Sequence, residues 1–186
     1  MASDRVIWFR TVPAGPDGAA GENGHTGPSV PGASVGAVQP LPGITTLDHV
    51  GIAVPDFDAA VEFHRRVLGL ELAHEEVNEE QGVREGMLRA PGDPPGGPAV
   101  QLLAPLTPQS PIARFLDRSG PGLQQLAYRV ADVEAASAAL RAAGLRLLYD
   151  EPRRGTAGSR INFVHPKDAG GVLVELVEPA PGGPGH

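Results

Sequence analysis

The segment Asp48-His49-Val50-Gly51-Ile52-Ala53-Val54-Pro55-Asp56 occurs in two related forms in this chain of 186 residues. The second form is Gln124-Gln125-Leu126-Ala127-Tyr128-Arg129-Val130-Ala131-Asp132, displaced by a constant 76 positions. Each form runs into a helical pattern that closes on Gly-Leu, at Gly69 and at Gly144. Self-similarity at a fixed offset is the signature of a repeated structural unit. The sequence therefore predicts a duplicated module.

Each module is expected to begin with a strand, continue into a helix and end with further strands. In the first strand, alternation puts Val50, Ile52 and Val54 on one face and His49 and Gly51 on the other. An Asp N-cap and a Gly just past the end predict the helices over 59–68 and 133–143. Later strands are predicted at 70–77, 83–90 and 99–103, and at 146–149, 161–164 and 172–177. The fold class is thus α+β, with two βαβββ modules at 46–105 and 123–179.

Glycine and proline are concentrated at the two ends of the chain, which contains 25 Gly and 20 Pro in total. Such segments bury too little apolar surface to offset the entropy lost on ordering. We therefore expect residues 1–43 to form a disordered N-terminal extension and residues 180–186 a disordered tail. The folded domain is expected to span residues 44–179.

Composition and charge exclude several classes of protein. The formal net charge is −7, and no cluster of Lys and Arg suggests a nucleic-acid-binding face. The chain has no cysteine, which excludes disulfides and thiolate chemistry. The longest apolar runs are too short for a transmembrane helix or a signal peptide. We expect a cytoplasmic protein that binds neither nucleic acid nor membrane.

The repeat brings polar residues from four strands to the face without helices. His49 and Gln125 occupy equivalent places on the first strands, and Gln101 and Glu175 do so on the last strands. A pseudo-twofold duplication gathers these four side chains at the centre. An imidazole nitrogen, amide oxygens and a carboxylate oxygen form an acceptable ligand set for a divalent metal ion. From the residues alone, a polar concave face without metal is an equally valid interpretation.

Longer stretches of the chain resemble the methylmalonyl-CoA epimerases, a family of the vicinal oxygen chelate, or glyoxalase-like, superfamily. The resemblance covers residues 46–178. It is most specific where the sequence reads Asn-Glu-Glu-Gln-Gly-Val and Tyr-Asp-Glu-Pro. The stretches that carry it are His49–Val54, Glu76–Val83, Gln101–Pro105, Leu148–Gly155, Ile161–Lys167 and Gly171–Leu176.

This resemblance implies a cup of mixed sheet with outer helices, formed by the two modules around a divalent metal. It places the metal ligands on His49, Gln101, Gln125 and Glu175. The ion is expected to be Co²⁺, with Mn²⁺, Ni²⁺ or Zn²⁺ as other possibilities. The family usually has His-His where this chain has Gln124-Gln125. Because an amide oxygen is a weaker donor than imidazole, the affinity for Co²⁺, Ni²⁺ or Zn²⁺ should be lower.

The resemblance also implies an activity, the interconversion of (R)- and (S)-methylmalonyl-CoA at C2. Its two acid–base carboxylates fall on Glu85 and Glu175. Inversion requires proton removal on one face and delivery on the other, which two carboxylates on opposite sides can provide. A metal ion stabilises the negative charge as a Lewis acid. We expect the partners to be an acyl-CoA substrate and a second copy of the chain, in a homodimer.

Two alternatives remain open at this point. The first is a glyoxalase-like lyase or isomerase on the same scaffold. The second is a metal-poor module that binds small molecules and has lost the chemistry, an interpretation that Gln125 favours.

Overall fold

The computed structural model describes residues 43–94 and 96–181. The chain divides into two units, Met1–Ala37 and Val38–His186, and every described residue belongs to the second. The predicted extension (1–43) and tail (180–186) therefore lie almost entirely outside the described residues. The predicted domain boundaries remain predictions.

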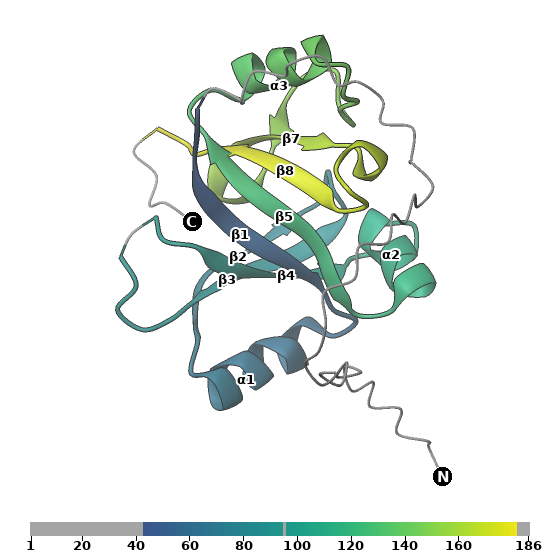
Figure 1. Cartoon of the computed structure of the whole chain (residues 1–186). Helices are drawn as coiled ribbons and strands as arrows, with labels where there is room; N and C mark the ends of the chain where they lie inside the picture. Colours follow the sequence, from purple (N-terminus) through teal and green to yellow (C-terminus); the bar gives the residue numbers. More distant parts are fainter. Residues whose placement is uncertain (1–42, 95, 182–186) are drawn as a thin grey trace, which may run out of the picture. The chain divides into compact units, whose positions relative to one another are not determined.

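Eight strands of the described residues form one mixed sheet in the order β2-β3-β4-β1-β5-β8-β7-β6 (Figure 1). The strands are β1 (Ile44–Ala53), β2 (Glu71–Asn78), β3 (Val83–Arg89), β4 (Ala99–Pro105), β5 (Gly122–Val130), β6 (Arg153–Arg154), β7 (Arg160–Val164) and β8 (Leu173–Glu178). The helices are α1 (Phe57–Leu68), α2 (Pro111–Ser119) and α3 (Val133–Ala142), with short 3-10 turns η1 (Thr156–Gly158) and η2 (Pro166–Asp168).

The pairing of the strands repeats from one half of the sheet to the other. In each half the first strand lies parallel to the last strand, β1 beside β4 and β5 beside β8. The remaining pairs within each half are antiparallel. The two halves join through the antiparallel pair of β1 and β5. This duplicated, curled sheet confirms the predicted glyoxalase-like fold of two βαβββ modules.

A separate apolar cluster anchors one helix of each module on the sheet. Asp56 caps α1 by accepting from the backbone N–H of Ala59, and Asp132 caps α3 in the same way. The cluster between α1 and the sheet has the buried members Val54, Phe57, Leu88, Leu102 and Ala104. The cluster between α3 and the sheet has the buried members Val130, Val133, Ala136, Leu140, Val164 and Leu176. Ile52 of β1 and Val54 just after it pack in the α1 cluster, as the sequence predicts, and His49 lies on the opposite face.

The strand predicted at 146–149 is wrong, because Leu147 makes only an isolated bridge to Val164. Two backbone hydrogen bonds still join this segment to the end of β7, from the Leu148 N–H to the Phe163 carbonyl and from the His165 N–H to the Arg146 carbonyl, both at 2.8 Å. At Tyr149, side chains bond the backbone instead. The Asn162 amide contacts both N and O of Tyr149, at 3.3 and 3.1 Å, and Arg141 donates to the Tyr149 carbonyl. Ladder pairing resumes at the two-residue strand β6.

Helix α2 lies between the modules in sequence and was not predicted. Its boundaries do carry signals. Ser110 accepts from the backbone N–H of Ala113, Pro111 occupies the first turn, and Gly120 follows the last residue. Ile112 packs with Val83 and Leu103 of the first module. α2 thus covers the end of the cup next to β4.

Within residues 43–94 and 96–181, no helix is long and apolar enough to cross a membrane.

Candidate active site

The four predicted metal ligands converge because small residues separate them in the sheet. Gly51 on β1 lies between Gln101 on β4 and Gln125 on β5. Ala127 on β5 lies in the same way between β1 and Glu175 on β8. The long polar side chains can therefore reach across these positions and meet above the centre of the sheet.

Gly51 does not leave open space above the sheet. A Cβ atom at this position would lie 2.5 Å from Cγ of Gln125 and 3.3 Å from a methyl group of Leu103. Real Cβ atoms essentially never approach another heavy atom so closely. The Gln125 side chain therefore crosses directly over the Gly51 backbone, which only glycine permits.

The amide nitrogen of Gln125 lies at the centre of the ligand set. It is 2.5 Å from Oε2 of Glu175, 3.3 Å from Oε1 of Gln101 and 3.3 Å from Nε2 of His49. His49 Nε2 and Glu175 Oε2 are themselves 3.1 Å apart. All four residues are at most 6% exposed. Three atoms that can bind a metal ion, one each from His49, Gln101 and Glu175, thus converge on one point. The Gln125 amide occupies that point.

This arrangement fits a divalent metal ion. A half-turn of the Gln125 amide would present its oxygen in place of its nitrogen, completing a set of one imidazole nitrogen and three oxygens. Such a mixed, oxygen-rich set suits borderline or hard divalent ions. That His49, Gln101, Gln125 and Glu175 are metal ligands stays a prediction.

His49 is oriented from behind by Asp48 and Arg129, two residues that the sequence analysis did not single out. His49 Nδ1 is 2.9 Å from Oδ1 of Asp48, which is fully buried. Arg129 Nε donates to the other Asp48 oxygen at 2.8 Å, and Arg129 Nη2 forms an ion pair with the same oxygen at 2.6 Å. Burial acts to lower the pKa of His49, but hydrogen bonds to Asp48 and Glu175 outweigh it and raise the pKa to about 9. A carboxylate on Nδ1 is the usual partner of a histidine that binds metal through Nε2.

Glu85 on β3 borders the ligand set. Its Oε2 accepts from Nε2 of Gln101 at 3.1 Å, and its Oε1 is buried with no hydrogen-bond partner among the described residues. Burial raises the pKa of Glu85 to about 7, the nearby carboxylates of Glu76 and Glu175 add to the rise, and a hydrogen bond with Thr156 opposes it. A buried carboxyl group with a free oxygen is costly unless a ligand uses it.

Thr156 is a further site residue that the sequence analysis missed. Its hydroxyl accepts from Nε2 of Gln101 at 3.0 Å, and its side chain is buried. This contact turns the Gln101 amide so that its oxygen faces Gln125. Thr156 belongs to the second module and Gln101 to the first, so no local sequence signal predicts their meeting.

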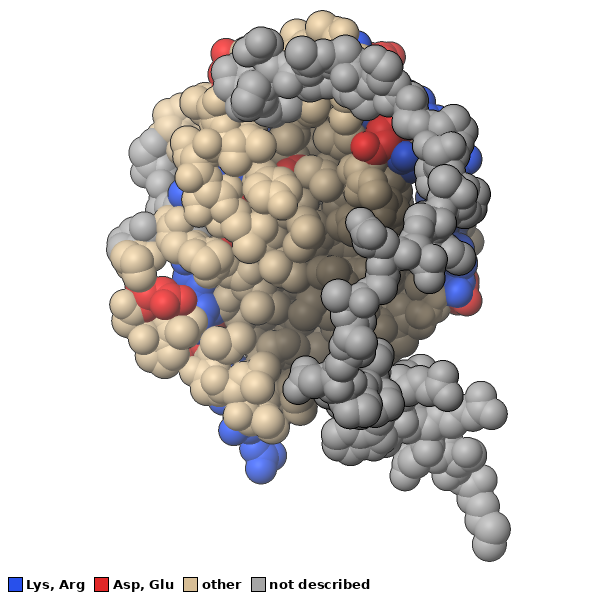
Figure 2. All heavy atoms as spheres, in the orientation of Figure 1, with Lys and Arg blue, Asp and Glu red and all other residues tan. Residues whose placement is uncertain are grey.

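A pocket of about 220 Å³ opens beside these side chains. Glu85, Gln101, Gln125 and Glu175 line its polar floor. The apolar walls include Leu103, Ile112, Leu148, Tyr149, Phe163 and Leu173. In the view of Figure 2, Lys, Arg, Asp and Glu of the described residues lie mainly around the edge, and the centre is largely uncharged. A pocket of this kind suits a small ligand with an apolar body and a few polar atoms.

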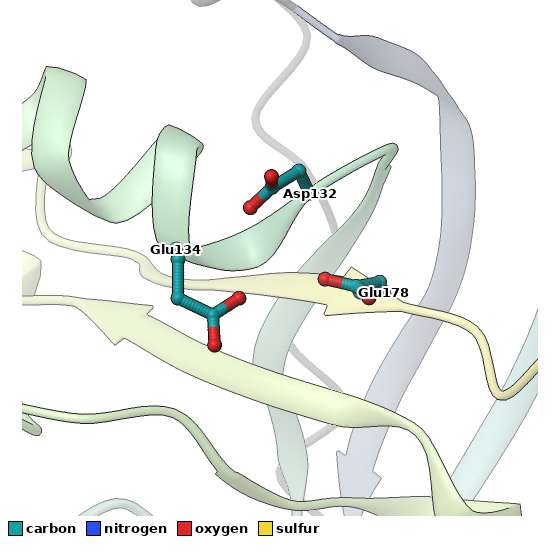
Figure 3. A group of neighbouring side chains, drawn as sticks. All are labelled: Asp132, Glu134 and Glu178. Atoms are coloured by element: carbon teal, nitrogen blue, oxygen red, sulfur yellow. The ribbon is translucent and has the colours of Figure 1, made fainter.

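A second group of acidic side chains lies outside this pocket. Asp132, Glu134 and Glu178 offer oxygens within 4.8 Å of one another at the start of α3 (Figure 3). Each has a structural partner: Asp132 caps the helix, Glu178 accepts from the Val133 N–H, and Glu134 pairs with Arg160. These contacts account for the cluster without a metal ion.

The structure brings together all five residues predicted from the sequence, His49, Glu85, Gln101, Gln125 and Glu175. It adds Asp48, Arg129 and Thr156. Asp48 could have been found from its place directly before His49. Arg129 contacts Asp48 across the β1–β5 junction, so it carries no sequence signal of its own.

Comparison with known proteins gives a consistent result. Residues 48–163 match the model of the glyoxalase/bleomycin resistance protein/dioxygenase superfamily. The chain is 39% identical over 135 residues to the ethylmalonyl-CoA/methylmalonyl-CoA epimerase of Cereibacter sphaeroides, covering 72% of this chain and 97% of that protein.

Solved structures agree with this result. The methylmalonyl-CoA epimerase of Mycobacterium tuberculosis is 58% identical, with a TM-score of 0.71 over 75% of this chain and 91% of that one. A methylmalonyl-CoA epimerase in complex with methylmalonyl-CoA and NH4+ is 51% identical, with a TM-score of 0.70 over 74% and 96%. The chain therefore belongs to the glyoxalase/bleomycin resistance protein/dioxygenase superfamily and, within it, to the methylmalonyl-CoA epimerase family.

Proposed function

We propose that this protein interconverts the (R) and (S) forms of methylmalonyl-CoA by proton transfer at C2. The observation that carries the proposal is that two buried carboxylates, Glu85 from β3 and Glu175 from β8, line the same pocket. Relatives named as methylmalonyl-CoA epimerases support the same reaction. They favour it over the glyoxalase-like and binding-module alternatives.

Each carboxylate would serve one face of the substrate. Glu85 and Glu175 come from different modules and are linked through Gln101 and Gln125, whose side chains lie between them. The C2 atom would lie over these amides, so that one carboxylate removes the proton and the other delivers one from the opposite side. The free, buried Oε1 of Glu85 is the atom we assign to the proton on its face. Positioned acid–base groups of this kind contribute about 10²–10⁴-fold to a rate.

We further propose that His49, Gln101, Gln125 and Glu175 hold a divalent metal ion, with Co²⁺ as the first candidate. When bound, the ion would supply Lewis-acid stabilisation of the negative charge that develops on the thioester and carboxylate oxygens. Asp48 keeps Nε2 of His49 directed into the site. A proton and the ion compete for that nitrogen, so metal binding would release a proton. The cytoplasmic location and the homodimer stay predictions.

Replacing Glu85 by Gln tests the two-base assignment. Glu85→Gln keeps the shape of the side chain and its contact with Gln101 but removes the proton carrier. Epimerisation should fall by about 10²–10⁴-fold. Exchange of the C2 proton with D₂O, followed by NMR for each enantiomer, should persist for one enantiomer only. Co²⁺ content should be unchanged.

Glu62→Gln provides the matched control, because Glu62 lies on the surface of α1 with its side chain 55% exposed. It should leave epimerisation at the wild-type rate. Wild-type epimerisation in Glu85→Gln would refute the two-base assignment. Loss of Co²⁺ in Glu85→Gln would show that Glu85 is a ligand and not a base.

A further inference from the structure

The two stretches that most specifically resemble the epimerase family, Glu76–Val83 and Leu148–Gly155, come from different modules and meet in space. Gln81 Nε2 donates to the carbonyl of Arg154 at 3.3 Å. Arg153 pairs with Glu80 at 2.7 Å, although both side chains are half exposed. These contacts hold residues 153–159, which we call the strap, against the β2–β3 hairpin.

The strap carries Thr156 into the active site. It is a tight turn in which the Gly155 N–H donates to the Ser159 carbonyl and the Ser159 N–H donates to the Thr156 carbonyl. A Cβ at Gly155 would lie 2.6 Å from Ile161 and from the Ser159 hydroxyl, so the turn is closely packed. The position of the Thr156 hydroxyl beside Gln101 thus depends on the position of the whole strap.

Glu76 contacts the strap at Ala157, the residue next to Thr156. Its Oε2 accepts from the backbone N–H of Ala157 at 3.0 Å and from Nε2 of His74 at 2.7 Å. Ala157 has a φ of 53°, the only positive φ among the non-glycine residues that the structure describes. A residue with a Cβ stays in this left-handed conformation only when its surroundings hold it there. The Glu76 carboxylate supplies one such constraint.

Glu76 also lies directly opposite Glu85 in the β2–β3 ladder. It therefore has two ways to affect the site. It can hold the strap through its reach to Ala157, or it can act on Glu85 through its charge. The length of the side chain governs the first effect, and the charge governs the second.

We propose that Glu76 is a positioning residue for the epimerase reaction, which holds Ala157 and thereby places the Thr156 hydroxyl against Gln101 and Glu85. The substrate does not need to contact Glu76 for this role. The inference rests on the proposed roles of Glu85 and Gln101. It gives a role to Glu76, in the family-specific stretch Glu76–Val83, which has no part in the proton-transfer scheme.

Two variants of Glu76 separate reach from charge. Glu76→Asp keeps the charge but shortens the side chain by one methylene, so it should lose the hydrogen bond from the Ala157 N–H. It should lower kcat about 10-fold or more, because displacements near 1 Å cost rate steeply, while KM changes by less than about threefold. Glu76→Gln loses the charge but keeps an oxygen in place, so kcat should remain within about threefold of the wild type. Glu75→Asp is the matched control on the same strand, where Glu75 pairs with Arg84 instead, and it should have no effect.

A double variant tests whether Glu76 acts through Thr156. If it does, Glu76→Asp combined with Thr156→Val should be no slower than Thr156→Val alone, since coupled residues are not additive. Wild-type kcat in Glu76→Asp, a larger defect in Glu76→Gln than in Glu76→Asp, or additive defects in the double variant would each overturn the inference. An active Glu85→Gln enzyme would instead refute the two-base assignment on which the inference rests. An inactive Glu85→Gln with a fully active Glu76→Asp would refute only the role of Glu76.

Discussion

The two modules share a backbone plan but contribute different chemistry to the same pocket. Strand pairing makes His49 equivalent to Gln125, and Gln101 equivalent to Glu175. The duplication thus places four polar side chains symmetrically around one point. It leaves their identities free to differ, and here only one is an imidazole and only one a carboxylate.

The two modules differ more strongly on the neighbouring strands. Glu85 pairs with Leu103 in the first module, and the equivalent position in the second is Ile161, which pairs with Val177. Ile161 is buried in an apolar cluster with Phe163. The ligand positions therefore follow the repeat, whereas the second carboxylate required for two-base chemistry occurs in one module only.

The outer strands show how the second module departs from the repeat. In the first module, Gly86 leaves room for Phe57 and Leu72, which would lie within 3 Å of a Cβ there, and β2 runs unbroken. The equivalent position in the second module is Asn162, whose amide contacts the backbone of Tyr149. The Asn162 side chain thus bonds the backbone at Tyr149, where the short antiparallel pairing around Leu147 and Leu148 stops.

Glu175→Gln should have the largest effect on this comparison, because it makes the last strands of the two modules alike. The change removes a proton carrier and the charged ligand together. We expect Co²⁺ affinity to drop and epimerisation to fall by more than about 10³-fold, beyond the effect of Glu85→Gln. Calorimetric titration with Co²⁺ and an epimerisation assay would measure both. Retained Co²⁺ affinity would remove Glu175 from the ligand set.

Gly51→Ala makes the two modules alike at the small residues between the ligands, since the equivalent residue is Ala127. The new Cβ would meet Gln125 at 2.5 Å and displace it. Overpacking of this kind costs about 1–3 kcal/mol, so Co²⁺ affinity should fall about 10- to 100-fold if Gln125 is a ligand. Thermal unfolding would report the structural part separately. Wild-type affinity would show that the ion does not need Gln125 in its present place.

Gln125→His restores the symmetry of the first strands by matching His49. Imidazole is a better donor than an amide for Co²⁺ or Zn²⁺, so the affinity should increase about tenfold. Gln124→His is the matched control, one position away on the same strand, and should leave the affinity unchanged. Equal effects of the two substitutions would mean that Gln125 is not a ligand.

Asp168→Asn should have the smallest effect, a change in stability alone. Asp168 in η2 holds Arg146, the first residue of the segment 146–149. Hydrogen bonds from the Arg146 side chain and backbone hold the pKa of Asp168 well below its usual range. The carboxylate therefore stabilises the fold above about pH 4, and this stabilisation is lost as the pH falls further. The melting temperatures of wild type and Asp168→Asn should differ at about pH 7 and converge near about pH 2. A difference that does not depend on pH would argue against this ion pair.

Most of the fold could be predicted from the sequence because each element of the repeat can be recognised from a local pattern of residues. Alternation in β1 and β5, the Asp caps of α1 and α3, and the apolar final strands depend only on neighbouring residues. The strand expected at 146–149 is reduced to an isolated bridge at Leu147, and at Tyr149 the side chains of Asn162 and Arg141 bond the backbone in place of a strand partner. Helix α2 had usable capping signals at Ser110 and Pro111 that the repeat did not contain.

By itself, the sequence determined the duplicated module, the family and the five polar residues of the site. A constant offset and the order of the motifs can be found in the linear sequence without any structure. Only the tertiary structure decided how these residues touch. The crossing of Gln125 over Gly51, the support of His49 by Arg129, and the approach of Thr156 to Gln101 all join strands or turns from different modules. Such contacts depend on sheet curvature and register, which act over distances that local patterns do not encode.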